Sequence, residues 1–132
     1  VVGWETNRLA MLLAVLETRC GFALAGRDVY LNIAGGYRIG EPAGDLAAAA
    51  ALASSALDVT LPEGAIWFGE VALSGDIRPV ARMDARMREA ARLGFTHAFG
   101  PAASPEPPAG MRLTRITRLA DLITRLRQDA EA

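Results

Sequence analysis

The sequence predicts an α/β domain in which helices pack on a mixed sheet. Segments with apolar residues at helical spacing alternate with short segments rich in strand-forming residues, and no internal repeat interrupts this order. The 132 residues are 52% hydrophobic, which is enough to fill one compact core. We therefore interpret residues 1–132 as a single domain.

The N-terminal third contains one predicted helix and two predicted strands. The helix spans about residues 7–20, begins at a capping threonine or asparagine, and ends at Gly21. Its core face consists of leucines at helical spacing: Leu9, Leu12, Leu13 and Leu16. Strand composition follows at residues 29–33 and again at 37–39, with a sharp bend between them at Gly35–Gly36.

A second helix is predicted from Pro42 to about Leu57. Proline suits a first helical turn, and the acidic residues Glu41 and Asp45 are explained by capping and by the positive end of the helix dipole. The segment between Ala47 and Ala56 is mostly alanine, which has the highest helix propensity. We expect its small side chains to permit close approach of another element.

The middle of the chain predicts a buried strand followed by a hairpin. Residues 65–73 form an apolar run that reads as one strand, and Ser74-Gly75-Asp76 supplies a turn into a second strand at 77–80. The one acidic residue in the apolar run, Glu70, has no explanation from the sequence.

The last third predicts a helix, a strand, a loop, a strand and a terminal helix. The helix at 82–93 has its methionines and alanines inward and its arginines outward, and Gly94 closes it. Strands are expected at 95–99 and 112–116, with a proline-rich surface loop at 102–110 between them. The terminal helix is expected to fray over 128–132, beyond its apolar face of Leu119, Leu122, Ile123 and Leu126.

Composition excludes several function classes. The net charge of -1 gives no global positive field to draw the domain onto nucleic acid or an anionic membrane. The single cysteine, Cys20, excludes a disulfide framework and suits a reducing cytoplasm, where we interpret it as a buried structural thiol. The most apolar run, residues 46–56, is shorter than the ~20 residues of a membrane helix. We expect a cytoplasmic protein without membrane contact.

The chain contains no lysine, since all 14 basic residues are arginines. A phosphate-binding loop of the GxxxxGK[ST] type needs a lysine and is therefore excluded, so Gly35–Gly36 is better explained as a turn. His97 is the sole histidine, and we interpret it as a partnered, partly buried imidazole rather than a catalyst or zinc ligand. A Ser-His-Asp triad that joins His97 to one of four serines is disfavoured: Ser54, Ser55, Ser74 or Ser104.

Three segments carry a resemblance to a known family. They are residues 3–12, residues 28–36 together with Glu41-Pro42-Ala43-Gly44-Asp45-Leu46, and residues 68–80, which include Ser74-Gly75-Asp76-Ile77-Arg78-Pro79-Val80. In this order they resemble the C-terminal module of the RadA/Sms family, which is homologous to the proteolytic domain of Lon. The resemblance implies a Lon proteolytic-domain-like fold.

The same resemblance implies that the Lon catalytic dyad is missing. Lon uses a serine nucleophile activated by a lysine base. Alignment places Ala43 at the serine position and Asp84 at the lysine position, and arginine cannot substitute because its guanidinium stays protonated. We therefore expect no catalysis by this chain; the alternative is a residual Lon-like peptidase with an unrecognised nucleophile.

The densest basic segment is formed by five arginines: Arg78, Arg82, Arg86, Arg88 and Arg92. Helical spacing would bring Arg82 beside Arg86 and Arg88 beside Arg92. Asp84 and Glu89 partly neutralise this set, so a solvated helix face, a subunit interface and a DNA contact all remain open. The same alternatives apply to Arg112, Arg115 and Arg118.

For function, the resemblance implies a non-catalytic oligomerisation scaffold. Family members form rings and act as ATP-dependent DNA repair and recombination proteins that branch-migrate DNA alongside a recombinase. Their ATP and zinc belong to a RecA-like ATPase domain and a zinc finger, which lie outside these 132 residues, so this chain is expected to hold no cofactor or metal. DNA and the recombinase would be partners through the whole protein.

Overall fold

The computed structural model describes residues 6–21 and 42–131. The predicted strands at 29–33 and 37–39, the Gly35–Gly36 bend and Glu41 lie outside the described residues. In the described part the elements are, in chain order, α1 (Thr6–Cys20), a short 3-10 helix η2 (Pro42–Gly44), α2 (Asp45–Leu57), β1 (Ala65–Trp67), β2 (Glu70–Val71), β3 (Ile77–Arg78), α3 (Met83–Arg92), β4 (His97–Pro101), β5 (Arg112–Ile116) and α4 (Leu119–Glu131).

The strands form two sheets, and the predicted α/β class is confirmed. A three-stranded sheet has the order β1-β4-β5 with parallel pairing throughout, so that Ala98 in the central strand lies between Ile66 and Leu113. Strands β2 and β3 form a separate antiparallel hairpin. Parallel and antiparallel pairing are therefore divided between two sheets within the described residues.

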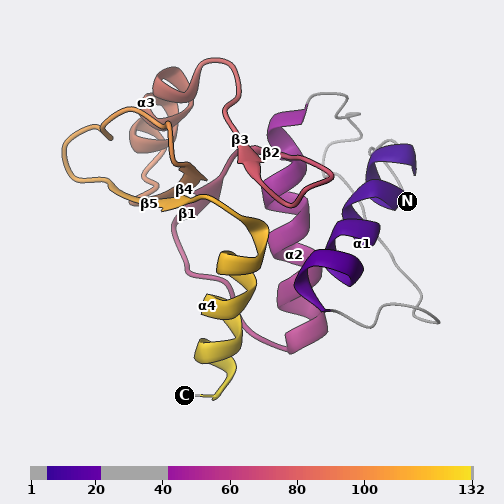
Figure 1. The fold of residues 1–132 in the computed structure, drawn as a ribbon. Helices are drawn as coiled ribbons and strands as arrows, with labels where there is room; N and C mark the ends of the chain where they lie inside the picture. The colour runs from indigo at the N-terminus through magenta and orange to yellow at the C-terminus, as the bar shows by residue number, and fades with distance from the viewer. Residues whose placement is uncertain (1–5, 22–41, 132) are drawn as a thin grey trace.

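Helices cover both faces of the three-stranded sheet. Ala98 and Phe99 are consecutive in β4 and therefore point to opposite faces. Ala98 belongs to a cluster with Met87 of α3, while Phe99 belongs to the larger cluster with Leu122 of α4. Figure 1 accordingly shows α3 on one side of the sheet and α4 on the other.

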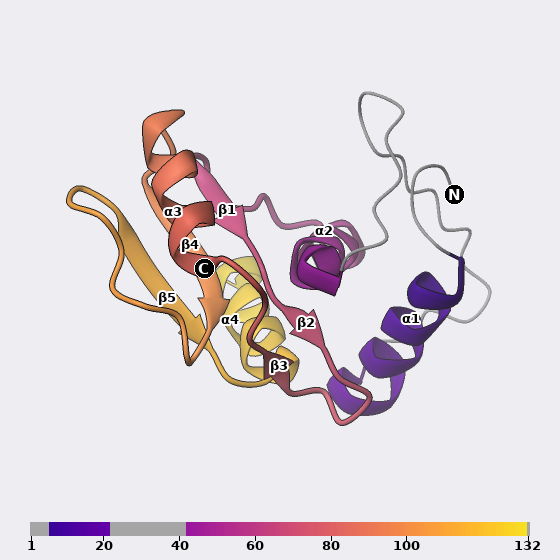
Figure 2. The same cartoon turned by 90° about the horizontal axis from the view of Figure 1, so that it is seen from above.

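The larger core lies among the helices. Leucines from three helices are fully or almost fully buried in it: Leu12 and Leu16 of α1, Leu46 of α2, and Leu119 and Leu122 of α4. Seen from above, α2 lies between α1 and the three-stranded sheet (Figure 2). The predicted core faces of these helices are therefore confirmed.

The alanine-rich face of α2 is used inside the domain. Four alanines, Ala48, Ala49, Ala50 and Ala53, are at most 7% exposed and belong to the larger core. The expectation of close approach is confirmed, but the neighbouring elements are helices of the same chain. This face is consequently not open to a second subunit.

The predicted continuous strand over residues 65–73 is wrong, because the chain breaks between β1 and β2. Gly69 has a φ of +153° there, and a Cβ at this position would lie 2.8 Å from Cγ2 of Ile77. The Gly69 N–H donates to the carbonyl of Ala43 and its carbonyl accepts from the N–H of Leu46. The hydrogen bonds of this segment are thus made with the start of α2.

Three boundaries also differ from the predictions. Arg82 has a left-handed φ of 59°, so α3 begins only at Met83. The strand expected at 95–99 is observed at His97–Pro101, because the Phe95 N–H still bonds to the carbonyl of Ala90 at the end of α3. The terminal helix, for which we expected fraying over 128–132, is helical as far as Glu131.

Other local predictions are confirmed. Gly21 and Gly94 have φ values of +75° and +95° where their helices end. The hairpin around Ser74–Asp76 and the strand at Arg112–Ile116 are observed. No helix within the described ranges is long and apolar enough to cross a membrane.

Candidate functional site

The segment at the predicted nucleophile position is buried. Ala43 lies in η2, is 5% exposed, and uses its carbonyl to accept the Gly69 N–H at 3.0 Å. Its methyl group offers neither a nucleophile nor a hydrogen-bond donor. Whatever Ala43 contributes here is therefore packing and backbone position.

Two residues later, Asp45 makes a buried ion pair that sequence reasoning missed. Its fully buried carboxylate accepts from the Arg8 Nε at 3.0 Å, from a second Arg8 nitrogen, and from the Val71 N–H at 3.1 Å. The capping explanation for Asp45 is wrong, because α2 has no side-chain cap and this carboxylate points instead to α1 and β2. It connects three elements at the start of α2.

Asp84, the residue at the predicted base position, is a solvated carboxylate. It lies in the first turn of α3, its side chain is 59% exposed, and Arg88 pairs with it at 3.3 Å. A solvated carboxylate at this position and an alanine at the position of the nucleophile give no counterpart of a Ser-Lys dyad.

His97 is buried and partnered, as the sequence interpretation predicted. Its Nε2 lies 2.7 Å from the Thr114 hydroxyl, its Nδ1 lies 3.4 Å from an Arg112 nitrogen, and its ring stacks on Phe99 at 4.1 Å. Burial lowers the pKa of His97, and the positive charges of Arg112 and Arg125 lower it further. The imidazole therefore stays neutral and structural near pH 7.

Three of the four serines named for a triad form hydrogen bonds with groups other than His97. Ser54 donates to the Val59 carbonyl, Ser74 to the Asp76 carboxylate at 3.0 Å, and Ser104 to the Pro101 carbonyl at 2.6 Å. In the described part of the chain no serine hydroxyl is hydrogen-bonded to His97. No nucleophile–base pair of the Ser-His type is assembled there.

Metal ligands are also not gathered. Within residues 6–21 and 42–131, no group of three or more His, Cys, Asp or Glu side chains is placed to hold an ion. Cys20 is half-buried rather than fully buried, and burial raises the pKa of its thiol while Arg127 partly offsets this.

The five arginines of the basic segment separate into two pairs and one further residue, Arg78. Arg88 pairs with Asp84, and Arg92 pairs with Glu89, both within α3. The side chains of Arg88 and Arg92 are therefore oriented by these carboxylates rather than by each other. Arg82 and Arg86 instead line one cleft, although Arg82 reaches it from a left-handed residue before the helix. The Arg86 Nε also donates to the carbonyl of Ala81 at 2.8 Å, which orients its side chain.

The remaining arginine, Arg78, accounts for the acidic residue Glu70 in the apolar run. The two residues lie directly opposite each other in the β2–β3 hairpin, as an opposite-charge cross-strand pair. Both also line a small cleft of about 330 Å³ beside Arg8. Glu70 is therefore a hairpin residue facing a cation.

The C-terminal arginines are engaged within the domain. Arg112 approaches His97, Arg115 donates to the Ser104 carbonyl at 2.9 Å and lies 3.6 Å from Glu106, and Arg118 lies 3.9 Å from Asp76. These contacts brace the loop after β4 and the start of α4.

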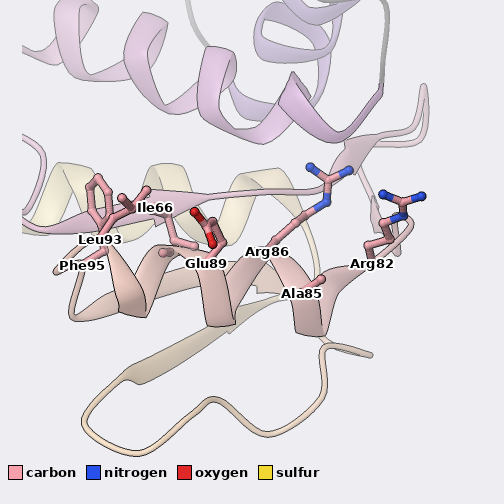
Figure 3. Close-up of a pocket in the computed structure, with 8 residues that line it drawn as sticks. Ile66, Arg82, Ala85, Arg86, Glu89, Leu93 and Phe95 are labelled. Carbon is pink, nitrogen blue, oxygen red and sulfur yellow. The ribbon is translucent and has the colours of Figure 1, made fainter.

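A candidate site with a clear polarity is a cleft of about 520 Å³ between α3 and β1. In Figure 3, Arg82 and Arg86 lie at one end of this α3 cleft, Glu89 lies in the middle, and Ile66, Leu93 and Phe95 lie at the other end. Leu93 is 62% exposed and Phe95 37% exposed, which are unusual values for large apolar side chains. The cleft is thus cationic at one end and apolar at the other.

Sequence reasoning found the arginines of this cleft but not its apolar end. The available signal was the 4-3-4 spacing of Arg82, Arg86, Glu89 and Leu93, which is typical of one helix face. In the structure Arg82 precedes α3 and Leu93 follows it. Ile66 comes from β1, so no local pattern connects it with α3.

Comparison with known proteins finds close relatives along the chain. No family model matches it. A protein of Brucella abortus named DNA repair protein RadA is 50% identical over 128 residues, which cover 96% of this chain and 27% of that protein. Proteins with the same name from Mycolicibacterium smegmatis and Salmonella typhimurium are 42% and 44% identical over 100% and 93% of the chain. The chain spans about a quarter of the length of these relatives.

Proposed function

Because this chain belongs to the RadA family of DNA repair proteins, we propose that it serves DNA repair as a non-catalytic assembly domain. In this role it holds neighbouring subunits together and so positions the catalytic parts of a longer protein. Rings of such subunits would then surround or follow DNA.

The chemistry of the described residues supports a non-catalytic role. Ala43 has no nucleophilic atom, Asp84 is solvated and paired with Arg88, and His97 bonds to Thr114 rather than to a serine. The sequence has no lysine to act as a base elsewhere. We attribute the retained framework to structure rather than to peptide cleavage, on a Lon-like fold that lost its Ser-Lys dyad.

The observation that carries the assembly role is the α3 cleft. Leu93 and Phe95 leave apolar surface open at one end of a cleft that has two arginines at its other end (Figure 3), while the small-residue face of α2 is already buried. Exposed apolar surface rimmed by charged residues is typical of protein–protein contacts. Subunit contact would cover this surface.

The remaining properties of a RadA-type protein belong to the whole protein in this proposal. ATP and zinc would be bound by its RecA-like ATPase domain and zinc finger, and branch migration beside a recombinase in the cytoplasm would use those parts. The present chain contributes assembly and no cofactor site.

Sedimentation velocity of the 132-residue chain from about 1 µM to several hundred µM tests the proposal. We expect the weight-average sedimentation coefficient to rise with concentration, because association follows mass action. A chain that stays monomeric over the whole range would contradict the assembly role.

A second candidate function is an auxiliary contact with DNA. Residues 78–92 carry five arginines against two carboxylates, and neutralised phosphates would release counterions. Duplex affinity should then fall steeply with salt and fall further in the Arg82→Glu/Arg86→Glu chain. Unchanged affinity in that variant would exclude this patch.

The peptidase alternative has a simple test. Casein or a fluorogenic peptide should not be cleaved by the chain, because no activated nucleophile is assembled among the described residues. Turnover that a single serine substitution abolished would overturn the non-catalytic proposal.

A further inference from the structure

His97 and Arg112 form the first pair of the β4–β5 ladder. They are the first residues of their strands and lie directly opposite each other, so their side chains emerge on the same face of the sheet. The N–H of Arg112 donates to the carbonyl of Thr96 at 2.9 Å, which joins the two strands at this end. Strand β5 lies at the outer edge of the described sheet, so its first residue depends on β4 for strand pairing.

The partners of the imidazole determine which of its nitrogens carries the proton. A guanidinium donates hydrogen bonds and accepts none, so the Arg112 nitrogen at 3.4 Å requires Nδ1 of His97 to be the acceptor. The proton of the neutral ring is then on Nε2, which donates to the Thr114 hydroxyl at 2.7 Å. His97 is therefore neutral in this arrangement, with its one ring lone pair directed at an arginine.

Independently of the assembly role, we propose that the His97–Arg112 pair is a pH-sensitive contact, which closes the end of the β4–β5 ladder when His97 is neutral and opens it when His97 is protonated. A second proton binds the ring only at Nδ1, where it replaces an acceptor by a donor that faces another donor. The hydrogen bond is then lost. Two positive charges also lie directly opposite each other on neighbouring strands, which is unfavourable.

The charged groups around the imidazole oppose its protonation. Burial of the ring lowers the pKa of His97, and the positive charges of Arg112 in β5 and Arg125 in α4 lower it further. On the β1 side the residue opposite His97 is Ala65, which carries no charge. No carboxylate of the described residues is bonded to His97. A protonated ring therefore has no counter-charge there, and separation from Arg112 relieves the repulsion.

The opening is confined to the first pair, because the neighbouring residues are held in the cores. Ala98 and Phe99 follow in β4, are fully or almost fully buried, and belong to the clusters on opposite faces of the sheet. Met111 precedes Arg112 and is buried in the same cluster as Ala98. Protonation of His97 therefore breaks the contact at Arg112 while the rest of the sheet stays folded.

Nitrogen NMR of the imidazole in the 132-residue chain tests the protonation pattern directly, because the single histidine gives one set of ring signals. At pH 7.5 we expect a protonated Nε2 and an unprotonated Nδ1. A protonated Nδ1 at this pH would overturn the proposal, since Arg112 could not then donate to it.

The Arg112→Gln chain separates the charge from the hydrogen bond. A glutamine amide donates to neutral Nδ1 through its NH₂ group and accepts from protonated Nδ1 through its oxygen. The pKa of His97 should therefore rise in this variant. Arg118→Gln is the matched control, because Arg118 is 71% exposed and lies beside Asp76 rather than His97. Equal titration of His97 in the two variants would contradict the role of Arg112.

Amide hydrogen exchange between pH 7.5 and 5.5 locates the opening. Once the intrinsic pH dependence is removed, protection of the Arg112 N–H should fall by up to about tenfold per pH unit, because opening takes up one proton. The Phe68 N–H, which donates to the Phe99 carbonyl at 3.0 Å, should lose much less. Equal losses at both amides would show global unfolding and overturn the local opening.

The His97→Gln chain completes the test, because glutamine does not titrate in this range. Protection of the Arg112 N–H should then be independent of pH, while circular dichroism checks that the variant folds. A pH-dependent loss of protection that persisted without His97 would overturn the proposal.

Discussion

Removal of the Arg8 guanidinium should destabilise the domain far more than an exposed arginine does. Arg8 of α1 pairs with Asp45, whose carboxylate is 0% exposed and is otherwise bonded to the Val71 N–H. In the Arg8→Ala chain that carboxylate keeps one hydrogen bond and loses its counter-charge. An uncompensated buried charge is expensive, because water no longer solvates it.

The magnitude follows from this geometry. Breaking a buried ion pair from one side costs about 3–5 kcal/mol, and we reduce this to about 2–4 kcal/mol because water can enter beside a partly exposed arginine. Arg8 is 20% exposed, which justifies the reduction. Set against a total stability of about 5–15 kcal/mol, this loss is a large fraction.

Urea unfolding followed by circular dichroism measures the effect. Arg19→Ala, an exposed arginine on the same helix, is the control and should change the unfolding free energy by less than about 0.5 kcal/mol. The double variant Arg8→Ala/Asp45→Ala should lose less than the sum of the single variants, since both remove one interaction. Equal effects of Arg8→Ala and Arg19→Ala would refute the reasoning.

Two further predictions concern β4. Burial and the charges of Arg112 and Arg125 lower the pKa of His97 in the folded chain below 6.5. As the pH falls through this range, the unfolded chain therefore binds more protons than the folded chain does. The stability contributed by neutral His97 is thus complete above pH 6.5 and decreases below it. The urea concentration at the unfolding midpoint should therefore decrease between pH 7.5 and pH 5.5. If His97→Gln left this pH dependence unchanged, the assignment to His97 would be contradicted. Gly100→Ala should lower stability by about 1–3 kcal/mol, since overpacking forces neighbours to move. Its Cβ would lie 2.6 Å from the ring of Phe68, and an unchanged thermal midpoint would show that the ring yields freely.

The helices of this chain could be predicted almost to the residue. Apolar spacing and a glycine stop are local signals, so α1 ends at Cys20 beside Gly21 as expected, and α3 ends at Arg92, one residue before the predicted end. The limits of such signals appear at Arg82, whose left-handed backbone delays the start of α3 although its side chain fits the helical pattern.

Prediction of the strands was limited by distant partners. The break at Gly69 exists because its backbone bonds to Ala43 and Leu46, which lie more than 20 residues earlier. The composition of residues 65–73 shows only an apolar run, which predicts one strand. The same limit applies to Asp45, whose partner Arg8 is 37 residues away.

For the candidate site, the sequence located the charged residues and excluded a lysine-dependent reaction. It identified the basic segment around Arg86 and the absence of lysine, both of which are properties of residue type and spacing. It did not identify the cleft, because Ile66 reaches α3 only through the pairing of β1 with β4.

The sequence by itself determined the helix positions, the α/β class and the lack of a lysine base, since these depend on residue identity and on neighbours within a few turns. Only the tertiary structure decided which arginines are paired, which small-residue face is buried and where apolar surface stays open. The physical reason is that burial and ion pairing depend on contacts between distant segments, and those contacts exist only once the chain has folded.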